Sequence, residues 1–309
     1  MTVIARLKPY FRWAILGGTL FFLGTVLKHH WQKVVAIRLE STGLACLAIA
    51  LGITLLAHIC AGGVWSRLLQ DFRQPVQGVW LVQAYLKTTI AKYLPGNVWH
   101  YYGRITAATK AGATLETATV SVLLEPLLMA AAALSIALLG SQPIAAQFGL
   151  PVLVLQWVSL LVVLASVHPR IINPLVRYLG KLKQKATKAT GAVSPSIVAL
   201  EHYPLVPLLG EVGFLLLRSA GFLFTFLAIS PVLPSQLPLL LSAFSVSWLL
   251  GLVVPGAPGG IGVFEATAIA LLGQTFSPGL LLSVVALYRL VSILAEVAGA
   301  GLSWLDERL

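Results

Sequence analysis

Charged residues are scarce in this chain of 309 residues. They make up 10 % of it, whereas hydrophobic residues make up 58 %, and a soluble domain usually carries about 25 % charged residues. A chain this apolar could not cover its surface in water, so lipid must surround most of its length. The composition therefore excludes a large soluble enzyme domain.

The residues of disulfides, metal sites and nucleophilic catalysis are also few. The two cysteines, Cys46 and Cys60, lie in one expected helix about 21 Å apart along its axis, too far for a disulfide. The six histidines show no metal-ligand spacing, and no nucleophile and base stand together in a motif. We therefore expect no enzymatic activity, no cofactor and no bound metal.

The chain is nevertheless basic, with a net charge of +11. Its Lys and Arg residues gather in short loops between apolar runs, which is how membrane proteins set their topology. We therefore expect contact with anionic lipid headgroups rather than with nucleic acid.

Six apolar runs are long enough to predict membrane spans. The first has the layout of a signal peptide, but Lys28-His29-His30 follows it instead of a small-residue cleavage site, so we interpret it as a retained span. The sequence predicts an all-α, polytopic membrane helix bundle in one domain over residues 1–309, with spans at 10–27, 44–66, 117–139, 151–167, 205–229 and 280–304.

Two further apolar regions are interrupted by Pro-Gly turns. The first has arms 79–94 and 98–111 and carries four cations, so it cannot face lipid throughout. The second has arms 239–254 and 261–272, and its last arm is about 18 Å long as a helix, too short to cross. Broken helices at membrane depth must be buried or line a cavity. We predict two re-entrant hairpins, with turns at Pro95, Gly96, Pro255, Gly256 and Pro258.

The loop charges predict which segments share a side of the membrane. If the N-terminus is cytoplasmic and both hairpins return to the side they left, the cytoplasmic segments are 1–9, 67–116, 168–204 and 305–309. The outer segments are then 28–43, 140–150, 230–238 and 274–279. Loop 168–204 is strongly basic and the last three outer segments are uncharged, as the positive-inside rule requires; only 28–43 departs from it. We predict both termini on the cytoplasmic side of the plasma (inner) membrane.

With this topology the two hairpins enter from opposite faces. The chain then divides into two halves of inverted orientation, 44–167 and 205–304, joined by the basic cytoplasmic loop 168–204. Inverted repeats with interrupted helices in matching positions are typical of transporters. The sequence thus predicts two hairpin tips that meet inside the membrane.

Several residues of the hairpins could bind an anion. Arg104 could hold a phosphate through its planar guanidinium, or it could reach the interface from a structural turn. The glycines of the second turn leave backbone N–H groups exposed before a helix that begins near Glu265. Such helix N-termini attract anions. The same glycines would also suit a turn that needs close packing. The candidates of the second turn are Gly259, Gly260, Gly262 and Glu265.

Ionisable residues inside the predicted spans are further candidates, because they are costly there and usually mark a path or a site. Arg218 and Arg289 fall about 20–22 Å from the inner boundary by helical rise, and the carboxylates about 9–12 Å from it. This predicts a basic layer near mid-membrane above an acidic one, or else ion pairs that lock the bundle. The carboxylates are Glu125, Glu211 and Glu296.

These motifs resemble the lysylphosphatidylglycerol synthase transmembrane family, which includes the flippase region of bacterial multiple-peptide-resistance proteins. The resemblance covers residues 44–304, and one departure is Glu125-Pro126 where many members have Glu-Arg. The chain ends at Leu309 without the soluble aminoacyl-transferring domain, so we expect it not to make lysyl-lipid. The matching residues are Pro95, Gly96, Arg104, Pro255, Gly256, Pro258, Gly259, Gly260, Gly262, Glu265 and Arg289.

The resemblance implies a membrane protein that binds or translocates a phospholipid or a lipid-linked anion. Arg104, Arg218 and Arg289 would then hold the phosphate, together with the backbone of Gly259–Gly262. Two alternatives stay open: a secondary transporter of a small solute, in which Glu125 and Glu296 would suit proton coupling, and a non-transporting partner of a lipid- or glycan-modifying membrane enzyme. A homo-oligomer is compatible with each of them.

Overall fold

The computed structural model describes residues 40–94, 98–187, 199–254 and 258–306. The regular structure of these residues is entirely helical, as predicted. The predicted first span, 10–27, lies outside the described residues, and so do the turn residues Pro95, Gly96, Pro255 and Gly256. The α helices are α2 (Ser41–Asp71), α3 (Gly78–Thr89), α4 (Trp99–Lys110), α5 (Leu115–Ala137), α6 (Ser141–Phe148), α7 (Leu150–Ser166), α8 (Pro169–Thr187), α9 (Leu205–Leu227), α10 (Leu237–Val253), α11 (Val263–Leu272) and α12 (Pro278–Asp306). Short 3₁₀ turns add η1 (Ile90–Tyr93), η2 (Leu138–Gly140), η3 (Pro234–Gln236) and η4 (Pro258–Gly260).

Five helical segments in the described part of the chain are long and apolar enough to cross a membrane. Four of them, α2, α5 with η2, α9 and α12, confirm the spans predicted at 44–66, 117–139, 205–229 and 280–304. The predicted span 151–167 corresponds to α7, which qualifies only as a pair with Pro169–Tyr178, bent by 54°. The fifth segment, Pro234–Val253, contains the predicted arm 239–254 and is longer than predicted because η3 precedes it. The chain is a multi-span integral membrane protein.

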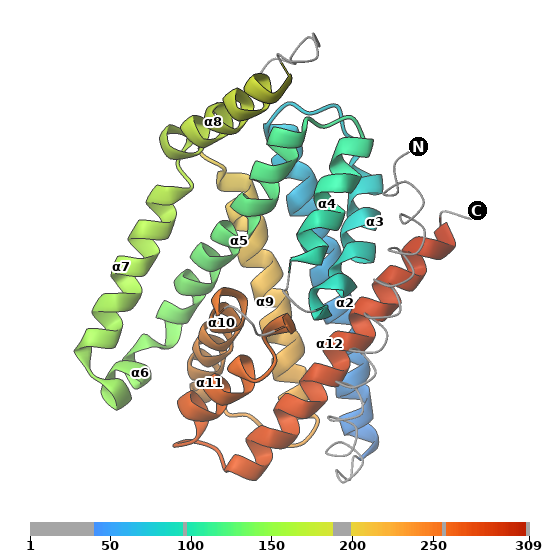
Figure 1. Ribbon diagram of the computed structural model, residues 1–309. Helices are drawn as coiled ribbons and strands as arrows, with labels where there is room; N and C mark the ends of the chain where they lie inside the picture. Colours follow the sequence, from blue (N-terminus) through green and yellow to red (C-terminus); the bar gives the residue numbers. More distant parts are fainter. Residues whose placement is uncertain (1–39, 95–97, 188–198, 255–257, 307–309) are drawn as a thin grey trace.

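The two interrupted regions form helical hairpins. At the open end of the first, the Thr114 backbone N–H donates to Oε1 of Gln74 at 2.9 Å, so α3 begins where α4 ends. At the open end of the second, the ring of Phe276, which follows α11, lies 4.7 Å from that of Phe226 near the end of α9. Each hairpin therefore returns to the end of the bundle from which it started (Figure 1).

The loops gather at two opposite ends of the bundle. Arg73 and Glu201 form an ion pair of 2.6 Å, and Gln83 hydrogen-bonds Asp306, which brings segments 67–116 and 168–204 and the end of α12 together. At the other end, Gly140 lies against the carbonyl of Pro238. These contacts place Arg73, Gln83, Glu201 and Asp306 at one end of the bundle and Gly140 and Pro238 at the other.

Helices α2 and α9 run antiparallel in direct contact. A Cβ on Gly210 would lie 2.5 Å from Cγ2 of Val64, and one on Gly221 would lie 2.5 Å from Oγ1 of Thr54. Small residues permit this close approach of helix backbones in membranes. The contact places the middle of α9 against the middle of α2, with α5 and α12 on either side of the pair.

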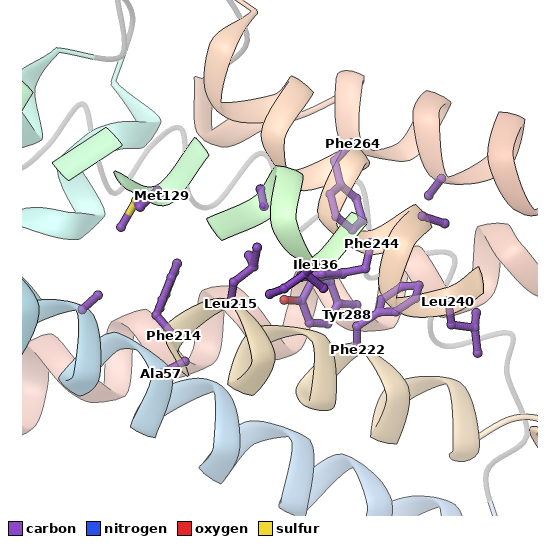
Figure 2. Packing of buried hydrophobic residues seen from close by; sticks show 14 of the residues in the cluster. Ala57, Met129, Ile136, Phe214, Leu215, Phe222, Leu240, Phe244, Phe264 and Tyr288 are labelled. Carbon is purple, nitrogen blue, oxygen red and sulfur yellow. The ribbon is translucent and has the colours of Figure 1, made fainter. Parts of the chain in front are cut away.

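An aromatic cluster fixes the second hairpin between α9 and α12 (Figure 2). Phe222 of α9 meets Phe244 of α10 at a ring distance of 5.4 Å, and meets Tyr288 of α12 edge-on at 5.3 Å. Phe264 of α11 stacks on Tyr288 at 5.9 Å. Ring contacts of this kind are specific in geometry, so the cluster sets the position of α12 relative to α9.

Candidate functional site

The tips of the two hairpins, represented by η1 and η4 beside the two turns, lie against each other. Tyr93, at the end of the first arm of the first hairpin, is 2 % exposed, and a Cβ on Gly259 would lie 2.8 Å from its Cε1 atom. Gly259 has a φ of +61°, a conformation that glycine adopts readily. The predicted meeting of the tips is therefore observed in these contacts.

Arg289 of α12 holds the tip of the second hairpin. Its guanidinium donates to the carbonyl oxygens of Gly259 and Gly260 at 2.8 Å each, and its Nε donates to Oε1 of Glu265 at 2.6 Å. The other carboxylate oxygen of Glu265 accepts from the Gly262 N–H at 2.6 Å. The second turn was predicted to bind an anion through the backbone N–H groups of its glycines. Instead, the carbonyls of Gly259 and Gly260 accept hydrogen bonds from Arg289, and the Gly262 N–H donates to Glu265 of the same turn. Pro258 begins the same turn as the first residue of η4.

Arg104 holds the first hairpin in a similar way. Its Nη1 lies 2.7 Å from Oε2 of Glu125 on α5, and both side chains are almost fully buried. The guanidinium also lies over the ring of Tyr85, 3.6 Å from its centroid. Arg104 and Arg289, both predicted to hold a phosphate, therefore each have a carboxylate partner inside the protein.

A third ion pair joins the first hairpin to the opposite half of the chain. Nζ of Lys92 in η1 lies 2.6 Å from Oε1 of Glu296 on α12, and Nε2 of His58 lies 3.5 Å from the same oxygen. Neither Lys92 nor His58 was among the residues predicted to bind the anion, although a Lys within an apolar arm indicates a partner inside the protein. Of the two arrangements expected for the intramembrane charges, ion pairing accounts for Glu125 and Glu296.

Arg218 differs from the other buried cations near the tips. It is 5 % exposed, its guanidinium lies 5.2 Å from the centroid of the Tyr288 ring, and its Nη1 lies 3.5 Å from Nε2 of His58. Among the described residues, no carboxylate lies within ion-pair distance of it, and its Nε has no hydrogen-bond partner. A buried guanidinium stays charged, so its unused donors favour an anionic ligand.

Glu211 is the corresponding exception among the carboxylates. It is 0 % exposed, and neither of its oxygens has a hydrogen-bond partner within the described part of the chain. Glu211 and Arg218 stand two turns apart on α9. Helix α9 thus carries a buried guanidinium and a buried carboxyl group for which the described residues provide no ion-pair partner.

Comparison with known proteins adds no family or relative. No family model matches the chain, and no curated protein matches it. Within the residues that the structure describes, no three His, Cys, Asp or Glu side chains are grouped so that they could hold a metal ion. The candidate site consists of Arg218 and His58, which lie beside the Lys92–Glu296 ion pair.

Proposed function

We propose that the chain binds and translocates an anionic phospholipid, whose phosphate is held by Arg218 beside His58. The observation that carries the proposal is the buried guanidinium of Arg218, which has no carboxylate partner among the described residues. Guanidinium groups bind phosphate through two parallel hydrogen bonds. The function therefore centres on one arginine of the three that the sequence suggested.

The balance of charge around the tips supports an anionic ligand. Lys92, Arg218 and Arg289 contribute three positive charges, whereas Glu265 and Glu296 contribute two negative ones. Buried charge is stable only when it is compensated. A phosphodiester headgroup carries one negative charge and would neutralise the excess.

The arrangement of the helices supports translocation. His58 and Arg218 are separated by 160 residues, and Pro95 and Pro255 are separated by the same number. The two contacting side chains thus stand at matching positions in the proposed inverted halves, 44–167 and 205–304, and the antiparallel α2 and α9 that carry them would lie along the axis between the halves. Transporters built from inverted repeats bind their substrate at such an interface and rock one half against the other. The two hairpins would be re-entrant, with both termini in the cytoplasm.

The lipid class of the substrate rests on the resemblance to the lysylphosphatidylglycerol synthase transmembrane family. Five of the matching residues form the two observed tethers and their turn: Arg104, Gly259, Gly260, Glu265 and Arg289. Under this proposal the chain acts on lipids of the plasma membrane without catalysing a covalent step and without a cofactor.

A reconstitution experiment tests the proposal. Purified protein is placed in vesicles that contain fluorescent phosphatidylglycerol, and transfer between leaflets is followed by chemical quenching of the outer leaflet. We expect protein-dependent transfer that is lost in Arg218→Gln and partly retained in Arg218→Lys. The exposed Arg67, which pairs with Asp71 on the surface of α2, gives the matched control Arg67→Gln, in which transfer should persist.

Two results would contradict the proposal. The first is equal transfer in the wild type and in Arg218→Gln, which would remove the guanidinium from the function. The second is no transfer of phosphatidylglycerol by the wild type. Uptake of inorganic phosphate by the same vesicles would then favour a small-solute carrier, and inactivity towards both would favour a non-transporting partner of a membrane enzyme.

A further inference from the structure

Glu211 is buried without any of the partners that a carboxylate needs. It lies in the mostly apolar helix α9, and its side chain is fully buried, with a relative exposure of 0 %. Both carboxyl oxygens lack a hydrogen-bond partner among the described residues. An isolated carboxylate in such a place is very costly, and the group becomes neutral instead. Such surroundings favour the neutral carboxylic acid over the carboxylate.

The ionisable groups around Glu211 reinforce this conclusion. Arg104 and Glu125 interact electrostatically with it, but Arg104 already neutralises Glu125 at 2.7 Å. One cation thus faces two carboxyl groups, and two like charges at one site cannot both persist. The remaining ionisable neighbours are Cys60 on α2 and Tyr85 on α3. Helix α10 has no ionisable side chain, and Tyr288 and Glu296 of α12 lie at the Arg218 end of α9.

Glu211 and Arg218 cannot neutralise each other directly. They are two turns apart on α9, about 10 Å along the helix axis. The buried side chains of Phe214 and Leu215 lie between them in the chain. At this separation, the charge at one site still changes the free energy of a charge at the other, because the surroundings have a low dielectric constant.

We propose that Glu211 is a proton-binding site, and that its proton is taken up and released together with the anion that binds Arg218. The proposal rests on the proposed anion site, and it names protons as the second ligand. A negative charge on Glu211 would repel an anion at Arg218, whereas neutral Glu211 would not. Binding of the proton and binding of the anion therefore favour each other. When both are bound, their charges cancel, so they cross the apolar interior together at a lower free-energy cost than either ion alone.

The size of this coupling follows from the separation. Two unit charges about 10 Å apart at an effective dielectric constant of about 20 alter each other's binding by roughly tenfold. Anion affinity should therefore rise about tenfold as Glu211 becomes protonated. A proton gradient across the membrane should then drive the accumulation of the anion.

The experiment measures binding of short-chain phosphatidylglycerol to the purified full chain by calorimetry, from acidic to alkaline pH. The phosphodiester keeps one negative charge throughout, so a change in affinity reports on the protein. We expect binding about tenfold tighter at acidic pH in the wild type and in the control Glu40→Gln, whose residue is exposed. Glu211→Gln should bind tightly at every pH. His58→Gln should keep the pH dependence, which separates Glu211 from the histidine beside Arg218.

A transport measurement complements the binding measurement. In vesicles, Glu211→Gln should still exchange labelled lipid between leaflets, but a proton gradient should no longer bias its distribution. The difference between the infrared spectra of the wild type and of Glu211→Gln at the same pH should contain the band of one neutral carboxylic acid, which the other carboxyl groups do not contribute because they are present in both proteins. This signature does not depend on transport, and Glu211→Gln preserves the shape of the side chain.

The outcomes separate this proposal from the proposed function. Binding that is independent of pH in the wild type, or that keeps its pH dependence in Glu211→Gln, overturns the proton site. Such binding would still support the anion site if Arg218→Gln abolished it. Absence of binding at any pH overturns both.

Discussion

The contact between the hairpin tips makes a sharp prediction for Gly259→Ala. The new Cβ would lie 2.8 Å from Cε1 and 3.1 Å from Cδ1 of Tyr93, and Tyr93 is buried and cannot move away freely. The substitution should therefore force the two tips apart as well as strain the turn. Its cost separates into these two parts.

Each part has a known size. A residue with a Cβ held at a φ of +61° costs roughly 1–2 kcal/mol relative to glycine. Overpacking against a buried ring costs about 1–3 kcal/mol more. Only the overpacking cost depends on the Tyr93 ring, so it should disappear when Tyr93→Val removes that ring. The double mutant should then be more stable than the sum of the single changes predicts, by about 1–3 kcal/mol.

The assay is unfolding of the purified protein in mixed micelles with a rising fraction of denaturing detergent. Tryptophan fluorescence follows the transition, and four proteins complete a double-mutant cycle: wild type, Gly259→Ala, Tyr93→Val and the double mutant. The cycle isolates the contact between the tips from the intrinsic cost of each substitution.

Gly260→Ala provides the matched control. Gly260 also has a positive φ, +71°, but its added Cβ would meet the backbone of Gly251 at 3.0 Å rather than Tyr93. Its effect should add to that of Tyr93→Val within about 0.5 kcal/mol. A coupling below that value for Gly259, or an equal coupling for both glycines, would refute the packing of the tips.

Two further predictions concern stability in the same assay. Arg104→Gln should destabilise the protein by about 3–5 kcal/mol because it leaves Glu125 buried without a cation, and adding Glu125→Gln should restore part of the loss; a double mutant less stable than Arg104→Gln would contradict this. Gly210→Ala should cost about 1–3 kcal/mol through overpacking, because its Cβ would lie 2.5 Å from Cγ2 of Val64. Val64→Ala should relieve that cost, and purely additive effects would argue against the close contact of α2 and α9.

The positions of the hairpins followed from the sequence because they depend on local signals. Pro-Gly turns interrupt helices wherever they occur, and the length of an apolar arm shows whether it can cross the membrane. The second hairpin began earlier than expected because a proline in the first turn of a helix is tolerated, so η3 and α10 continue through Pro234 and Pro238.

The pairing of the buried charges could not be predicted in the same way. Counting the rise per residue gives the depth of a charge along its own helix, but not the helix that faces it. Lys92 and Glu296 are 204 residues apart, yet they lie 2.6 Å from each other. His58 has no sequence signal beyond its location in an apolar run. Only the tertiary arrangement shows that it faces Arg218.

The ion pairs leave α9 with two buried groups, Arg218 and Glu211, that have no ion-pair partner among the described residues. A broken helix exposes backbone groups that must find partners inside the protein, and Arg289 supplies them for the carbonyls of Gly259 and Gly260. Arg104 ties the first hairpin to α5, and Lys92 ties it to α12. Each of these charges forms an ion pair or hydrogen bonds that hold a hairpin, so binding a substrate in their place would loosen the hairpins. Arg218 and Glu211 hold neither tip through an ion pair. Changing their partners therefore costs no structural tether, which makes α9 the helix on which ligand binding can act.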